Sequence, residues 1–292
     1  MNADLKKLEN GNIELVMSIP WKTVEETYNL VVDDTVKEAE LPGFRKGKAP
    51  RATVEAQLDK NKAYETVLDR LIPDVYAQAV SEHKLKPVVS PQITLTKAKE
   101  AEDWVITAIT CEKPIITIGD YRKAITELKN EKRNKIWVPG QEPQTISPGK
   151  QGEEQEKEQK PSLDELLHAV YHTISVTLPP ILTEQEVTRM LSNFLDQTKK
   201  LGITIDQYLQ STGKTIETLR YEYEEEAKRT ITMELALGDI ADKEGITVED
   251  AEVEHIINTA KTPEEKEGLS KEKYYVASIL RRQKTIQLLA TV

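Results

Sequence analysis

The stretch from about Leu128 to Pro161 is too polar, and too rich in residues that break helices, to join a hydrophobic core. Its run from Lys150 to Lys160 holds six Gln or Lys residues and four Glu residues, a composition typical of linkers. Prolines and glycines are scattered through it, at Pro139, Gly140, Pro143, Pro148, Gly149 and Gly152. The sequence therefore predicts two domains, residues 1–112 and 162–292, joined by a linker over residues 113–161.

A four-stranded sheet is predicted for the first domain. Every second residue over residues 13–19 is apolar, which is the period of a half-buried strand. The turn signal Asn10-Gly11 before this strand predicts a hairpin with residues 4–8. Two more strands are expected over residues 92–96 and 104–111. This order of elements favours an α+β fold, in which helices pack on one face of an antiparallel sheet.

Three helical segments are expected between the second and third strands. The first begins near Thr23, which matches the capping-box template with Glu26. The others cover residues 51–58 and about 62–83, and Pro73 is expected to kink the longer one because proline removes a backbone hydrogen bond. A short loop joins the first two helices, so the sequence predicts a helix-loop-helix tip.

The loop at this tip is strongly basic, although the formal net charge of the chain is −10. Together with Arg51 it holds four cations and no carboxylate. It also carries Phe44, and an aromatic ring at a loop tip loses free energy in water unless it inserts into a partner. Gly43 and Gly47 permit positive φ angles, and Pro50 suits the first turn of the next helix. The loop is therefore a candidate docking site for a negatively charged surface.

This loop resembles the ribosome-docking signature of bacterial trigger factor, Gly-Phe-Arg-x-Gly-x-x-Pro, and every fixed position is met. The resemblance implies that the loop touches both protein and RNA of the large ribosomal subunit, beside the nascent-chain exit. Because the rest of the chain is acidic, any RNA contact would be confined to the loop. The ribosome-binding set implied by the resemblance is Gly43, Phe44, Arg45, Lys46, Gly47, Lys48 and Pro50.

The second domain is expected to be all-α, with extended helical arms. Three expected helix starts carry the capping-box template, namely Ser162 with Glu165, Thr183 with Glu186 and Thr204 with Gln207. The longest helix is expected from Ile216 to Lys243 and would span roughly 42 Å, which exceeds the width of a small domain. Such arms would leave apolar sides partly uncovered.

Segments such as Leu178-Pro179-Pro180-Ile181 and Lys200-Leu201-Gly202-Ile203 resemble the carboxy-terminal domain of trigger factor. The resemblance implies that the arms shield nascent or unfolded polypeptides. Candidate client-binding residues are Leu178, Ile181, Met190, Phe194, Tyr223 and Tyr275.

The linker departs from the family. Trigger factors usually carry an FKBP-type prolyl isomerase domain at this point, and a domain needs at least roughly 50 residues with a core of its own. We therefore expect an ATP-independent chaperone without isomerase activity. Two alternatives remain: a peptidyl-prolyl isomerase, as for longer family members, and an RNA-binding module that uses the basic loop alone.

Motifs for catalysis are absent from the sequence, so we expect no catalytic residue, no metal and no cofactor. His168 and His172 have the spacing of metal ligands on a helix, but the glutamate that a zinc protease uses as its base is missing between them. The single cysteine, Cys111, excludes an internal disulfide, and no signal peptide or membrane-spanning run is visible. We expect a cytoplasmic protein with no membrane partner. Homodimerisation of the free protein through its apolar arms is left open.

Overall fold

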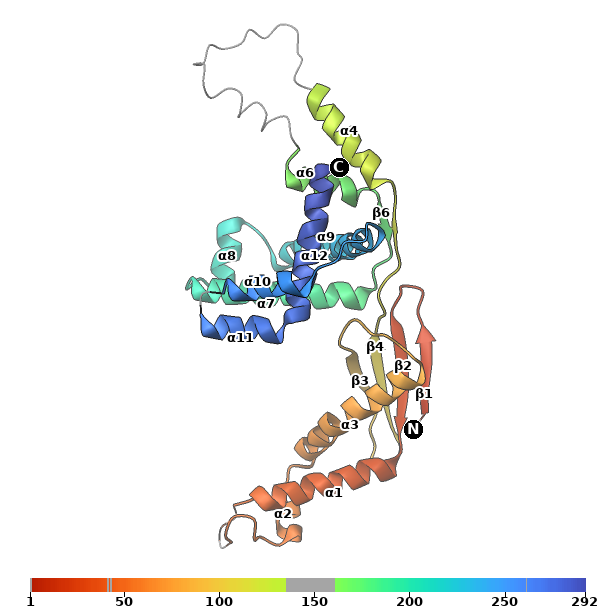
Figure 1. Cartoon of the computed structure of the whole chain (residues 1–292). Helices are drawn as coiled ribbons and strands as arrows, with labels where there is room; N and C mark the ends of the chain where they lie inside the picture. The colour runs from red at the N-terminus through yellow and green to blue at the C-terminus, as the bar shows by residue number, and fades with distance from the viewer. Residues whose placement is uncertain (1, 41, 43, 135–160, 261) are drawn as a thin grey trace. The chain divides into compact units, whose positions relative to one another are not determined.

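The computed structural model describes residues 2–40, 42, 44–134, 161–260 and 262–292 (Figure 1). It consists of two compact units. Unit 1 comprises Met1–Pro114 and Leu178–Arg189, and unit 2 comprises Ile115–Thr177 and Met190–Val292. Each unit is described by itself below.

Unit 1 contains the predicted four-stranded antiparallel sheet. Its strands are β1 (Asn2–Lys7), β2 (Ile13–Ile19), β3 (Gln92–Lys97) and β4 (Trp104–Thr110), in the order β1-β2-β4-β3. The alternation in β2 places one set of side chains in the core, Ile13, Leu15, Met17 and Ile19. Leu15 lies opposite Leu5 on β1 and Ala108 on β4, so the register carries this apolar face across the sheet.

Two long helices of unit 1 complete this core. They are α1 (Trp21–Glu38) and α3 (Lys60–Glu82), which pack against each other and contribute Val24, Val31, Val67, Leu71 and Val75. The capping box predicted at Thr23 is wrong, because α1 already begins at Trp21, whose N–H donates to the Asp103 carboxylate at 2.9 Å. One continuous helix, α3, passes through Pro73, and a kink there stays a prediction.

A segment far along the chain completes unit 1. The helix α7 (Pro180–Lys200) begins here, and the Ile181 N–H donates to the Asn12 Oδ1 at 3.4 Å. The Gln185 side chain donates to the carbonyl of Ser90 at 2.6 Å. Sequence patterns assigned residues 178–189 to the second domain, since contacts with residues 95 and 169 positions earlier leave no local signature.

Unit 2 is mostly helical, but it is not purely so. Strands β5 (Ile116–Ile118) and β6 (Ile174–Val176) pair antiparallel, and the all-α expectation missed them because three-residue strands carry no readable alternation. Residues 115–134, placed in the linker by their polar composition, form β5 and the helix α4 (Tyr121–Asn134). The rest of the predicted linker, residues 135–160, lies outside the described residues.

The core of unit 2 is formed by α4, α6 (Leu163–Tyr171), α9 (Ile216–Lys243) and α12 (Lys273–Thr291). Its buried members are Tyr121, Ile125, Leu166, Val170, Leu237, Ile240 and Leu289. Both ends of α9 fall where the sequence predicted them.

Helix starts in the second predicted domain, residues 162–292, were predicted in part. The capping boxes at Ser162 and Thr204 are confirmed, at the starts of α6 and α8 (Ile205–Thr212). The one at Thr183 is wrong, because α7 already begins at Pro180 and Thr183 is buried inside the helix. Proline at a first helical position is itself a start signal, since its missing N–H has no partner there.

Candidate functional site

The basic loop is closed at its base by backbone contacts. The Gly47 N–H donates to the carbonyl of Ala39 at 3.1 Å, just after α1, and the Lys48 N–H donates to the carbonyl of Arg45 at 2.9 Å. Gly47 has a φ of +70°, and a Cβ atom on it would lie 2.7 Å from the carbonyl oxygen of Lys37. Only glycine fits this position without a shift. Gly43, which the sequence also assigned to the docking set, lies outside the described residues.

The side chains of the loop point outward. Phe44 is 45% exposed, and Arg45, Lys46 and Lys48 are exposed as well. Within the described residues, none of these three cations has a carboxylate within 4.0 Å. Ala49 beside them is buried and anchors the loop, and Pro50 is the exposed N-cap of the helix α2 (Arg51–Gln57). Within the part of the loop that the structure describes, one ring and three cations without a carboxylate partner thus lie on a fixed base.

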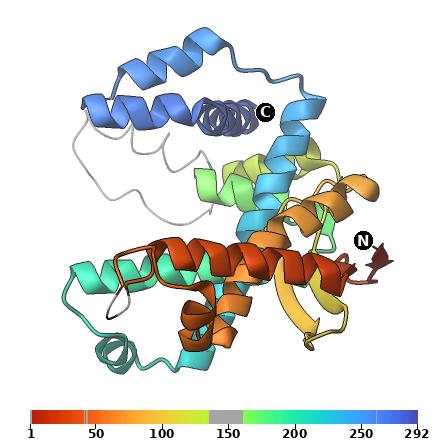
Figure 2. The ribbon, with the colours of Figure 1, turned by 90° about the horizontal axis from the view of Figure 1, so that it is seen from below.

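Arg51 differs from its neighbours, which corrects the predicted group of four cations. Its Nη1 lies 2.9 Å from the Oδ1 of Asp33, and its Nη2 donates to the side-chain oxygen of Asn29. Both partners lie on α1, and α2 lies beside that helix in Figure 1 and in Figure 2. Three cations, rather than four, are available to a partner.

A second charge cluster ties α1 to α3. Asp34 accepts from Lys37 at 2.9 Å and from Arg70 at 2.9 Å. The hydrogen bond from Lys37, with that from Arg70, lowers the pKa of the Asp34 carboxyl below its ordinary value. One surface ion pair, Arg70 with Asp34, therefore joins α3 to α1, the helix that leads into the loop.

The first arm of unit 2 is formed by the end of α7, α8 and the start of α9. Phe194 lies edge-on to Tyr208 with ring centroids 4.8 Å apart, and 6.1 Å from the Tyr223 ring. Burial is the main cause that raises the pKa of Tyr223. Phe194 and Tyr223, both predicted as client-binding residues, are thus brought together and half-buried.

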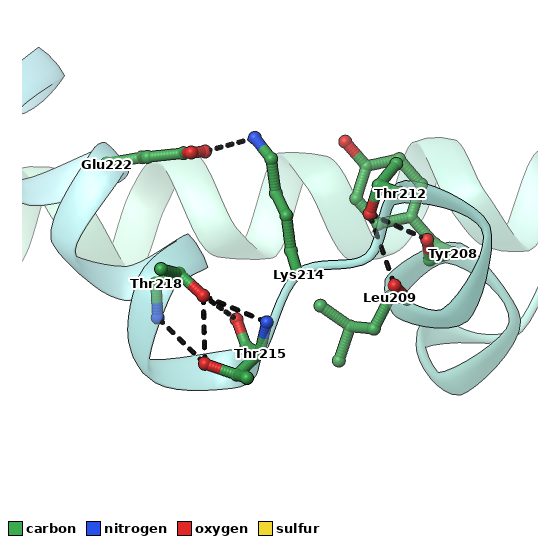
Figure 3. A network of polar contacts seen from close by, with 7 residues as sticks. All are labelled: Tyr208, Leu209, Thr212, Lys214, Thr215, Thr218 and Glu222. Carbon is green, nitrogen blue, oxygen red and sulfur yellow. Dashed lines mark hydrogen bonds and ion pairs between the residues drawn. The ribbon is translucent and has the colours of Figure 1, made fainter.

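The turn between α8 and α9 is held by polar contacts, shown in Figure 3. Lys214 pairs with Glu222, and Thr215 caps α9 through the N–H of Thr218 at 3.2 Å. Large apolar side chains remain exposed on this arm, at Leu201, Ile203, Ile205, Ile216 and Tyr221. The sequence analysis did not include these residues among the candidate client-binding residues. Most of them lie in or next to turns, and Tyr221 lies within α9.

The second arm is formed by α10 (Asp250–Asn258), α11 (Pro263–Lys271) and the start of α12. A groove of about 680 Å³ lies along it, lined by Ile256, Ala260, Glu265, Leu269 and Glu272 among others. Tyr275, predicted as a client-binding residue, is 59% exposed, and its neighbour Tyr274 is 95% exposed. The arm therefore carries both a groove and exposed aromatic rings.

The remaining predicted client residues do not share these surfaces. Ile181 is only 1% exposed and belongs to the core of unit 1. Leu178 is half-buried in the same unit, and Met190 is half-buried in unit 2. Ile181 is therefore a packing residue that no client can reach in the folded protein.

No metal centre is found in the part of the chain that the structure describes, because no group of three His, Cys, Asp or Glu side chains converges there. The Nε2 atoms of His168 and His172 lie 3.3 Å apart on the surface. Burial raises the pKa of the Cys111 thiol to about 11, so this cysteine is a core residue. None of the described helices combines the length and apolar character needed to cross a membrane.

Comparisons with known proteins cover both units. The family model "Bacterial trigger factor protein (TF)" matches residues 1–136, and the model "Bacterial trigger factor protein (TF) C-terminus" matches residues 146–291. The chain belongs to the bacterial trigger factor family. The two trigger factor models leave only residues 137–145 and Val292 unmatched.

Individual trigger factors agree with this assignment. The trigger factors of Staphylococcus aureus strains JH9 and Newman are each 31% identical to this chain over 136 residues. The alignment covers 45% of this chain and 31% of each relative, so the chain spans less than a third of the length of these relatives in the match. A solved structure described as "Promiscuous Substrate Recognition in Folding and Assembly Activities of the Trigger Factor Chaperone" covers 99% of both chains, with a TM-score of 0.60 and 14% identity. This last likeness is one of fold.

Proposed function

We propose that this trigger factor docks on the large ribosomal subunit through its basic loop and shields emerging polypeptides with the two arms of unit 2. The observation that carries the proposal is the loop itself. It exposes Phe44 beside three cations that have no carboxylate within 4.0 Å among the described residues, on a base fixed by Gly47. An exposed ring and free guanidinium and ammonium groups suit a surface made of apolar protein and phosphate.

The chemistry of the loop divides the work between its side chains. Arg45 can hold a phosphate or carboxylate through two parallel hydrogen bonds, whereas Lys46 and Lys48 act as point charges. Phe44 contributes apolar area that returns free energy only when it is covered. Because the chain as a whole is acidic, the loop fixes where contact with RNA occurs.

The arms supply weak and plural contacts. Exposed apolar groups lie on both arms, for example Leu201 on the first and Tyr274 on the second. Individual sites near millimolar strength, about 4 kcal/mol each, add through effective concentration and still release their client without ATP. This mechanism needs no prolyl isomerase, and the nine positions between the two family segments, residues 137–145, could not house one.

The docking proposal is tested by co-sedimentation with purified ribosomes. A variant with Phe44→Ala, Arg45→Ala and Lys46→Ala is expected to lose co-sedimentation while its helical content is unchanged. Binding of this variant at the parent level would refute the proposal. The control also removes one exposed apolar side chain and two exposed cations elsewhere in unit 1, with Leu30→Ala, Lys62→Ala and Lys86→Ala, and should bind as the parent does.

Isomerase activity is tested separately. In a refolding assay limited by proline isomerisation, the protein is expected to leave the rate unchanged, because the nine residues between the two family segments are too few for an isomerase domain. Acceleration of the slow phase would contradict this part of the proposal and favour the isomerase alternative. Suppression of aggregation of a client that contains few prolines reports on the arms alone.

A further inference from the structure

Arg51 is the cation beside the loop whose charge is already engaged. We propose that it is a positioning residue, which clamps α2 onto α1 and holds the docking loop in its binding conformation without itself touching the ribosome. This inference rests on the proposed docking function.

The geometry around the guanidinium carries the argument. The Nη1 atom of Arg51 lies 2.9 Å from the carboxylate of Asp33, and its Nη2 atom donates to the side-chain oxygen of Asn29. The carboxylate of Glu55 lies 4.0 Å from its Nε atom. Arginine is suited to such a site because its donors are rigidly arranged and cannot be deprotonated. A phosphate would have to displace these partners, whereas Arg45 has no carboxylate within 4.0 Å among the described residues.

The position of Arg51 in the fold explains why a clamp is needed. It is the first residue of α2, a helix of seven residues without a side-chain N-cap. A helix this short is not stable by itself, so its place depends on tertiary contacts. Inside the helix only Val54 is buried. The backbone hydrogen bond from Gly47 to Ala39 closes the base of the loop. Arg51 adds a side-chain contact that joins the start of α2, directly after the loop, to α1.

If Arg51 positions the loop, its removal is expected to have a different effect on ribosome binding than if Arg51 contacts the ribosome directly. If loss of the clamp reduces the binding-competent fraction to about one fifth, the apparent affinity falls about fivefold, with the contacts themselves unchanged. A residue that meets phosphate also sets the salt dependence, and its loss lowers the slope of log affinity against log salt by about 0.7 to 0.9. Arg51→Ala is therefore expected to weaken binding about fivefold and to leave the salt dependence unchanged. Arg45→Ala, in contrast, is expected to lower both the affinity and the slope of log affinity against log salt.

The sharpest variant is Asp33→Ala. It removes a negative charge near the loop, so simple electrostatics predicts stronger binding to an anionic ribosome. Loss of the clamp predicts weaker binding instead. The matched control is Glu25→Ala, which removes an exposed carboxylate of the same helix that has no ion-pair partner among the described residues. This control should bind at least as well as the parent protein.

The experiment is a titration of the full chain with purified large ribosomal subunits, monitored by fluorescence of a label on the protein, over a series of KCl concentrations. Arg51→Ala and Asp33→Ala are expected to weaken binding without a change of slope. The double variant Arg51→Asp with Asp33→Arg restores the ion pair in reverse and should recover most of the affinity. Circular dichroism checks that helical content is kept in each variant.

Two results would overturn the positioning role. One is a lower slope for Arg51→Ala together with tighter binding for Asp33→Ala, which would make Arg51 a contact residue. The other is unchanged affinity for both variants, which would make the pair irrelevant to docking. Failure of the docking function itself is distinguishable, because the triple variant at Phe44, Arg45 and Lys46 would then bind as the parent does.

Discussion

The docking loop of unit 1 and the arms of unit 2 present exposed apolar groups in opposite ways. The loop places one ring, Phe44, on a base fixed by a glycine, two backbone hydrogen bonds and a buried alanine. The arms spread many apolar groups, such as Leu201 and Tyr274, over helices and turns. A single rigid contact suits one partner of fixed shape, and a dispersed surface suits partners of many shapes. Under the proposed function, the fixed loop would serve the uniform partner, the ribosome, and the dispersed arms would serve the varied clients.

The largest difference between the two units is expected in stability. It concerns Ile181 and Tyr275, two residues that the sequence analysis named together as candidate client-binding residues. Ile181→Ala removes a fully buried side chain from unit 1 and is expected to lower the free energy of unfolding by about 2 to 5 kcal/mol. Tyr275→Ala, at an exposed site on the second arm, should change it by no more than about 0.5 kcal/mol. Urea denaturation followed by circular dichroism measures both. A small cost for Ile181→Ala would show that this helix start does not belong to the core of unit 1.

The next effect compares two glycines with similar backbone angles. Gly47→Ala meets both a positive φ and the carbonyl of Lys37, whereas Gly213, with a φ of +66°, has open space around its missing Cβ. The left-handed conformation costs about 1 to 2 kcal/mol at either site. Gly47→Ala should therefore be the more destabilising, and it should also weaken ribosome binding. Equal destabilisation by the two, with binding unaffected, would contradict a fixed loop base.

The sequence anticipated the sheet and the loop because both are local patterns. The alternation of apolar residues predicted β2, and the eight consecutive residues 43–50 predicted the loop. Contacts between distant residues left no such pattern. Residues 178–189 pack into unit 1 through hydrogen bonds to Asn12 and Ser90. Arg51 pairs with a carboxylate eighteen positions earlier, that of Asp33. Strands β5 and β6 were missed because each is too short to show a period.

The candidate client-binding residues show what helical spacing leaves open. Spacing singled out Phe194 and Tyr223, and the ring of Phe194 lies close to those of both Tyr208 and Tyr223. Ile181 has the same apolar character and is buried. Spacing alone cannot distinguish a stripe that another element covers from one that remains open.

A smaller effect on client binding is expected from substitutions on the arms, because many weak sites each contribute a small part of the binding free energy. The pair Tyr274→Ser and Tyr275→Ser should reduce suppression of client aggregation about two- to threefold and leave ribosome binding unchanged. Light scattering of a refolding client measures this. Asn258→Ser with Gln283→Ser, two exposed polar residues of the same arm, provides the control. Complete loss of activity from the tyrosine pair would instead indicate one dominant site.

The smallest effect is a dependence of stability on pH at the base of the loop. Because Lys37 and Arg70 lower the pKa of Asp34 below 3.8, its stabilising contribution is present above that value and is lost as the pH falls through the folded-state pKa. Asp34→Asn should therefore lower the free energy of unfolding slightly near neutral pH and have less effect in acid. Urea denaturation at about pH 6 and about pH 3 measures the difference. An equal effect at both values would show that the ion pairs do not contribute.

The most direct test of the account is a photocrosslinking residue placed at Phe44 in the full chain and irradiated with ribosomes. We predict a covalent product with a component of the large subunit, and none from the same group placed at Leu30, which is exposed on α1. If position 44 yields no ribosomal product, or no more than position 30 does, the loop is not the docking site.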